Sequence, residues 1–129
     1  MNALNAGLYS ALTGTAITTA LGGTSVYHLQ APDGQDLPYV IFSWQGGGQT
    51  NLVPKLTDVV EFIRVYATSA AQAGTIDTLI QTALDNAPLT VTGWSNILIQ
   101  REDEYETVEN LPSGEFIYTV GGMYRIILD

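Results

Sequence analysis

The residues of this sequence that could carry chemistry are a lone histidine, a run of glycines and a group of carboxylates. His28 is the only histidine, and the 129 residues include no cysteine, which excludes thiol catalysis and cysteine-based zinc sites. A Ser-His-Asp triad would have to use His28, yet no G-x-S-x-G motif accompanies it. We therefore interpret His28 as structural and predict no catalytic residue.

The glycine run, Gly46-Gly47-Gly48, could suggest a phosphate-binding loop. No Lys-Ser/Thr pair follows it and no helix is predicted to begin there, so neither the Walker pattern nor the dinucleotide fingerprint is met. We expect a polar surface loop over residues 45–56, either an interaction arm or a mobile connector, and its length favours the arm. The candidate subunit or partner interface comprises Gln45, Gly46, Gly47, Gly48, Gln49, Thr50, Asn51 and Leu52.

Carboxylates crowd the end of a predicted hairpin near the C-terminus. Paired carboxylates can act as the acid and base of a glycosidase or bind calcium, but the D-x-D-x-D-G calcium spacing is absent. A continuing strand would point Glu102, Glu104 and Glu106 to one side and Asp103 with Tyr105 to the other. We interpret the cluster as a solvated acidic tip, not a metal site. It comprises Glu102, Asp103, Glu104, Glu106, Glu109 and Glu115, the first five forming a candidate acidic lumen or solvent face.

Composition sets limits on the class of protein. The length and the 46% hydrophobic content predict one domain over residues 1–129 with a sizeable core. Four basic residues against 13 acidic ones give a net charge of −9, which disfavours tight binding to nucleic acid or to anionic membranes. No apolar run approaches the roughly 20 residues of a spanning helix, and residues 1–22 lack the basic start of a signal peptide. We expect no membrane association.

Two apolar segments, residues 37–44 and 59–67, must position the glycine run between them. Both are rich in β-branched and aromatic residues, which predicts a pair of central strands. In the second segment, Arg64 shares one face with Val60, Phe62 and Tyr66, and the other face carries Glu61 with Val59, Ile63 and Val65. Each face is mostly apolar, so we expect helices to cover one face and another body, such as a partner subunit, to cover the other.

The remaining segments supply helices and a long hairpin. Leucines at positions 4, 8 and 12 predict a first helix that breaks near Gly14 and resumes as a short turn over residues 16–21. Ser69 can cap a second main helix through Ala87, before Pro88. Residues 25–29 read as a short strand, residues 89–95 as an edge strand or a loop, and residues 96–108 and 115–128 as a hairpin.

These elements predict an α+β fold in the order α-β-β-β-α-β-β. The sheet is expected to be mainly antiparallel, with about four to five strands and two main helices packed on one face. In the return strand of the hairpin, Gly122 lies among large apolar residues and is expected to mark a bulge or a close approach.

The order of elements and several short sequence segments resemble those of the tail terminator, or tail completion, proteins of long-tailed bacteriophages, prophages and related elements. The resemblance spans almost the whole chain and is one of order and spacing. It is carried by the leucine-rich first helix, Val26-Tyr27, the segments 37–42 and 60–67 with the helix that follows, and the closing segment 124–128.

The resemblance implies a structural virion protein, not an enzyme, with no cofactor. It implies a homo-oligomeric ring, commonly a hexamer, that caps the tail tube protein and joins the tail to the head–tail connector or stopper protein, with DNA passing through without sequence-specific binding. Such a protein is located in the tail or neck of the virion, and in the host cytoplasm during assembly. The alternatives are a neighbouring connector or stopper protein of the neck, a small acidic dimeric binding module, and a small hydrolase using the clustered carboxylates.

Overall fold

The structure, a computed structural model, describes residues 2–50 and 56–129, which form an α+β fold with one sheet. The order of elements matches the prediction, with the short helix α2 added to the two main ones. The elements are α1 (Asn2–Leu12), α2 (Thr15–Leu21), β1 (Val26–His28), β2 (Tyr39–Gln49), β3 (Thr57–Ala67), α3 (Ala70–Leu84), β4 (Asn96–Asn110) and β5 (Phe116–Leu128).

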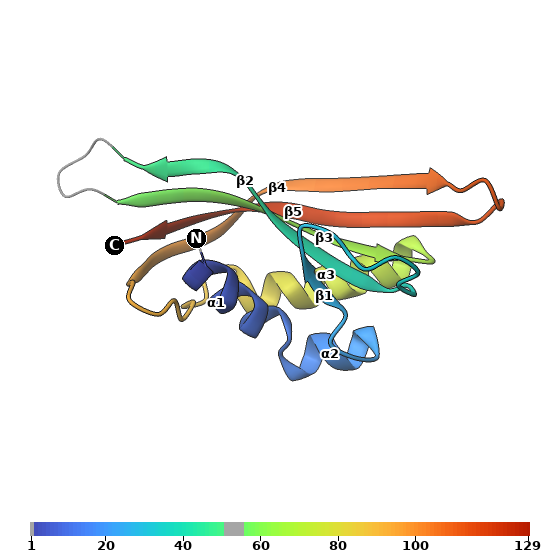
Figure 1. Cartoon of the computed structure of the whole chain (residues 1–129), viewed down its shortest axis with the longest axis horizontal. Helices are drawn as coiled ribbons and strands as arrows, with labels where there is room; N and C mark the ends of the chain where they lie inside the picture. Colours follow the sequence, from blue (N-terminus) through green and yellow to red (C-terminus); the bar gives the residue numbers. More distant parts are fainter. Residues whose placement is uncertain (1, 51–55) are drawn as a thin grey trace.

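The described strands form a single sheet in the order β1-β2-β3-β5-β4. β1 is parallel to β2, and the other neighbours are antiparallel. The helices lie together on one face of the sheet, and the β4–β5 hairpin extends past them at one end (Figure 1). Within the described part of the chain, no helix has the length and apolarity that a membrane crossing requires.

The alternation in β3 decides which sheet face meets the helices. Val59, Ile63 and Val65 are 0–1% exposed and belong to the core cluster with the leucines of the helices. Because side chains alternate along a strand, Arg64 and Tyr66 point to the opposite face, where they remain partly exposed. The two faces predicted for this strand are confirmed.

The helix layer follows its apolar spacing. Leu4, Leu8 and Leu12 of α1 are buried at steps of four residues, which places them on one side of the helix. The chain breaks at Gly14, as predicted, and α2 adds further buried side chains. In α3 the buried stripe comprises Ala73, Ile76, Asp77, Ile80 and Leu84.

The prediction of a long loop over residues 45–56 is wrong for its first part. β2 continues through the glycine run to Gln49, and Gly46, Gly47 and Gly48 pair with residues of β3. A bulge after Trp44 shifts the register, and Gly47 has a φ of 106°, where a Cβ would collide with the carbonyl of Asp58. Glycine therefore lets the strand bulge and approach its neighbour closely, instead of ending it.

The predicted hairpin near the C-terminus is confirmed with nearly the expected bounds. β4 has 15 residues and β5 has 13, and they remain paired out to Asn110 and Phe116. The outer strand is exposed at every residue from 102 to 110, so the acidic half of the hairpin leaves the core as expected. Residues 89–95 form a loop with one isolated bridge between Val91 and Trp94.

The N-cap of α3 gives a first testable prediction. The Ser69 Oγ accepts a hydrogen bond of 3.1 Å from the Gln72 amide, which would otherwise lack a partner at the helix start. The substitution Ser69→Ala should lower the free energy of unfolding by about 1 kcal/mol, measured by urea titration with circular dichroism. Ser113→Ala, in the exposed hairpin turn, is the control. Equal midpoints for the two variants would contradict the capping role.

Candidate functional site

A buried ion pair ties the base of the hairpin to the helix layer. The Arg101 guanidinium of β4 donates two hydrogen bonds, of 2.9 and 2.8 Å, to the two carboxylate oxygens of Asp77 in α3. The two side chains are 3% and 9% exposed. The same guanidinium donates to the Tyr124 hydroxyl at 3.1 Å and to the Gly121 carbonyl at 2.8 Å. A bidentate pair fixes both distance and orientation, so it holds β4 against α3.

Gly122 makes this ion pair possible. Arg101 reaches α3 across β5, and a Cβ on Gly122 would lie 2.6 Å from the Arg101 Nε. The close approach predicted for Gly122 is therefore confirmed, and the approaching group is a guanidinium. Burial lowers the pKa of Arg101, but hydrogen bonds and charge from Asp77 and Tyr124 outweigh it and raise the pKa above its ordinary value. Arg101 thus stays charged.

The helix-free face of the sheet carries a second, more exposed ion group. Arg125 donates to Asp58 at 2.8 Å and to Glu102 at 2.5 Å. Glu102 therefore lies on this face, while Glu104 reaches Arg101 on the helix side at 2.7 Å. The prediction that Glu102 and Glu104 share one side is wrong, because a bulge between Arg101 and Asp103 shifts the register.

An arginine among aromatic rings occupies the middle of this face. We call Tyr39, Phe62, Arg64, Tyr66 and Tyr105 the Arg64 cluster. The Arg64 guanidinium carbon lies 4.7 Å from the centroid of the Phe62 ring and 5.8 Å from that of Tyr66. Tyr39 stacks on Tyr66, and Tyr105 meets Phe62 edge to face, each with centroids 5.0 Å apart. Burial raises the pKa of both Tyr39 and Tyr66.

The charge of Arg64 is not neutralised by a carboxylate of the described residues. Arg101 and Arg125 form ion pairs, whereas Arg64 forms none within the described ranges. Its Nε is buried and, among the same residues, has no hydrogen-bond partner. The sequence places Arg64 beside Phe62 and Tyr66 by strand alternation, but it does not show that the arginine lacks a partner.

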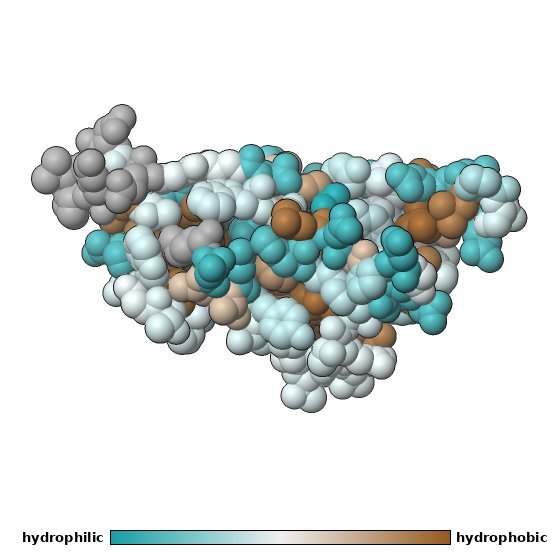
Figure 2. All heavy atoms as spheres, in the orientation of Figure 1, coloured by the Kyte–Doolittle hydropathy of each residue, from teal (hydrophilic) through white to brown (hydrophobic). Residues whose placement is uncertain are grey.

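The free end of the hairpin combines charge with exposed apolar side chains. Val108 is 51% exposed and Phe116 is 49% exposed. At this end Figure 2 shows hydrophobic side chains next to hydrophilic ones. A long arm that exposes both kinds of side chain has the composition expected of a contact surface.

Glu61 is a buried carboxylate that sequence reasoning missed. The predicted face, shared with Val59 and Ile63, was correct, and it puts the carboxylate in the core at 1% exposure. Neither carboxylate oxygen has a hydrogen-bond partner among the residues described. Burial raises the pKa of Glu61 to about 7. The sequence pattern that could have predicted this burial is a charged residue, Glu61, between apolar residues on the strand face that points to the core.

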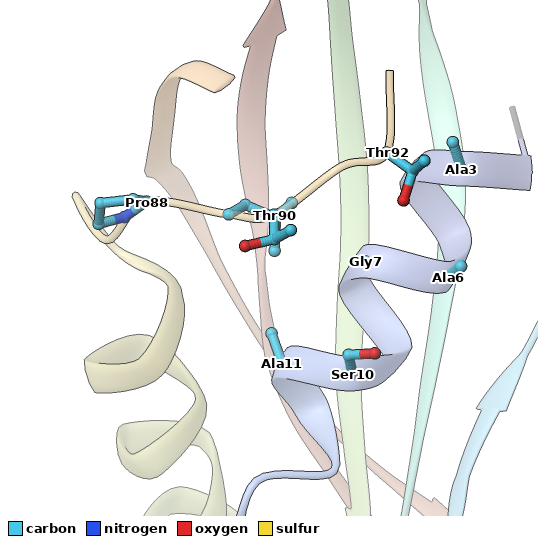
Figure 3. Close-up of a pocket in the computed structure, with 9 residues that line it drawn as sticks. Ala3, Ala6, Gly7, Ser10, Ala11, Pro88, Thr90 and Thr92 are labelled. Carbon is cyan, nitrogen blue, oxygen red and sulfur yellow. The ribbon is translucent and has the colours of Figure 1, made fainter. Parts of the chain in front are cut away.

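Other candidate sites offer little chemistry. His28 is exposed and rests against the Phe42 ring. The described residues hold no group of three or more His, Asp or Glu side chains suited to a metal ion. A groove of about 460 Å³ runs between α1 and the segment after α3 (Figure 3). Its lining is small and uncharged: Ala3, Ala6, Gly7, Ser10, Ala11, Pro88, Leu89, Thr90 and Thr92.

The predicted interface is only partly in the described chain. Gln45 to Thr50 lie at the end of β2 and just beyond it, and a backbone hydrogen bond of 2.7 Å joins the Thr50 amide to the Leu56 carbonyl. Asn51 and Leu52 lie outside the described residues. The roles predicted for residues 45–52 and for the acidic face remain predictions.

Comparison with known proteins decides the family. Residues 6–112 match the model of a family described as tail completion protein gp17. The chain belongs to this family. The resemblance predicted from the sequence is thereby confirmed, and this tail completion protein is a structural component of a virion tail that assembles with other proteins of the particle.

A solved structure shares the fold. A chain from the virion of a native gene transfer agent particle superposes with a TM-score of 0.70, at 15% sequence identity, over 95% of this tail completion protein and 92% of that chain. No curated protein matches the sequence.

The Asp77 and Arg101 pair should be essential for stability. Arg101→Met leaves the Asp77 carboxylate buried without its partner, so the free energy of unfolding should fall by about 3–5 kcal/mol. Chemical denaturation measures the change. The double variant Asp77→Leu/Arg101→Met should recover much of the loss, because no buried charge remains. Arg125→Gln, which breaks the exposed pair, is the control, and a loss as large as that of Arg101→Met would contradict this account.

Glu61 should make stability depend on pH. Its folded pKa of about 7 lies above the ordinary 4.5, so the folded state holds the proton more tightly. The contribution of Glu61 is most favourable below pH 4.5, falls as pH rises, and levels off above about pH 7, a total on the order of 3 kcal/mol.

The measurement compares Glu61→Gln with wild type by chemical denaturation at pH 5 and pH 8. The variant cannot ionise, so it should gain stability relative to wild type at pH 8. Glu106→Gln, at an exposed position, should keep the wild-type pH dependence. Parallel pH curves for wild type and Glu61→Gln would show that the carboxylate does not titrate in this range.

Proposed function

We propose that copies of this chain form a ring that caps the last ring of the tail tube and presents the finished tail to the head connector. The family match over residues 6–112 carries the proposal. The chain would act by its shape and its contacts, as a structural component of the tail.

The arrangement of the elements supports a ring. The helices cover one face of the sheet, and the hairpin projects past the body (Figure 1). The other face bears the Arg64 cluster. The β4–β5 hairpin and the helix-free face of the sheet are different surfaces. A contact between the hairpin of one copy and the sheet face of the next would therefore join two unlike surfaces. Repeated contacts between unlike surfaces generate a closed ring when the rotation between neighbours closes.

The charge suits a ring around DNA. The net charge of −9 would keep a lumen from holding the phosphate backbone, so DNA could pass without sequence-specific binding. The exposed carboxylates in the first part of β4, Glu102, Asp103, Glu104 and Glu106, are candidates for that lumen. A connector or stopper protein of the neck would share these features, so the test below separates the two functions.

Particles made without this chain provide the test. If the chain caps the tube, tails should lose length control or fail to join heads, as seen by electron microscopy of lysates. Supplying the chain from a plasmid should restore joined particles. Tails of normal length capped at their upper end, with DNA leaking from the heads, would indicate a stopper instead. Normal infectious particles would contradict both functions.

A further inference from the structure

We propose that neighbouring copies in the ring are joined by carboxylates at the free end of one copy's hairpin, Glu109 and Glu115, which bind the Arg64 cluster of the next copy. The inference rests on the proposed ring and adds the surfaces that hold it together.

Arg64 is built to accept a carboxylate. Its guanidinium is held between the Phe62 and Tyr66 rings, 4.7 and 5.8 Å from their centroids, so its position is fixed before any partner arrives. It forms no ion pair in the described part of the chain, and its Nε is buried without a hydrogen-bond partner there. The terminal nitrogens of the guanidinium are not among the buried atoms, so a carboxylate can pair with them in a partly desolvated place, where charged hydrogen bonds are strong.

The hairpin offers carboxylates that lack partners of their own. Glu102 and Glu104 are engaged by Arg125 and Arg101. Glu106, Glu109 and Glu115 are exposed and form no ion pair with any described residue.

Among the described residues, no carboxylate forms an ion pair with the Arg64 of its own chain. Arg64 pairs with Gly121, and Gly121 pairs with Tyr105, so the cluster lies beside the base of the hairpin. The ladder continues in register to Asn110 and Phe116, which carries Glu109 and Glu115 away from Arg64 along the strands. We expect a second copy of the chain to bind the Arg64 cluster, because every copy has more carboxylates than basic side chains and so brings carboxylates without a partner.

Charge exchange tests the contact. One variant carries Arg64→Glu, and the other carries Glu109→Lys and Glu115→Lys. Each variant alone places like charges at every contact between copies. The amount of assembled ring should therefore fall at least tenfold, measured by native mass spectrometry with tube protein present. Mixed in equal amounts, the two variants should assemble again with alternating subunits, because every contact then joins opposite charges. Asp33→Lys, in the exposed turn before β2, is the control for a change in charge.

The outcomes separate the inference from the ring itself. If wild type does not assemble even with tube protein, the ring fails and the inference fails with it. If wild type and the Arg64→Glu variant assemble equally, or if the folded variants do not recover on mixing, the contact is wrong while the ring stands. Circular dichroism establishes that each variant is folded.

Disulfide trapping provides a second measurement if a charge variant does not fold. The natural sequence has no cysteine, so any bridge between a copy with Tyr66→Cys and a copy with Glu109→Cys is intermolecular, and mass spectrometry distinguishes it from bridges between two copies of one variant. Oxidation of the mixed assembly should yield a covalent dimer of the two variants, and replacing Glu109→Cys with Asp33→Cys should not. Equal yields from the two pairs would overturn the inference.

Discussion

The bidentate pair between Asp77 and Arg101 is the interaction on which the rest of the structure depends. It joins β4, at one edge of the sheet, to α3, with bonds of 2.8 and 2.9 Å that cross β5 where Gly122 has no side chain. The free end of the hairpin extends past the helices and leaves the body (Figure 1). Because the base is fixed by two charged hydrogen bonds, the free end points in a defined direction, as a contact arm requires.

The same constraint explains the character of the uncovered face. Arg101 pairs with Asp77 and Glu104 on the helix side, and Arg125 pairs with Asp58 and Glu102. Arg64 remains, on a sheet face with no helix over it, held by aromatic rings. The chain has a net charge of −9, yet Arg64 forms no ion pair with any described residue. We therefore expect Arg64 to contribute to binding a partner more than to the stability of the fold.

Much of the fold was predictable because it rests on local periodicity. Alternation assigned both faces of β3, the leucine spacing placed α1, and Ser69 marked the start of α3. The glycine run was wrongly predicted to be a loop, because the prediction used local composition and did not consider pairing with another strand. In the structure, the valine-rich strand β3 pairs with the glycines and holds them in the sheet. The ion pair was not predictable, because Asp77 and Arg101 are 24 residues apart and their approach depends on Gly122 in a third element. The lack of a partner for Arg64 is likewise a property of the tertiary structure.

The most direct test of the central claim is a cryo-electron microscopy reconstruction of the head-proximal end of isolated tails. The account predicts a closed ring of this chain on the last ring of tube protein, with the hairpin of each copy lying against the uncovered sheet face of its neighbour. A chain bound as a single copy or an isolated dimer, or located elsewhere in the particle, would contradict it.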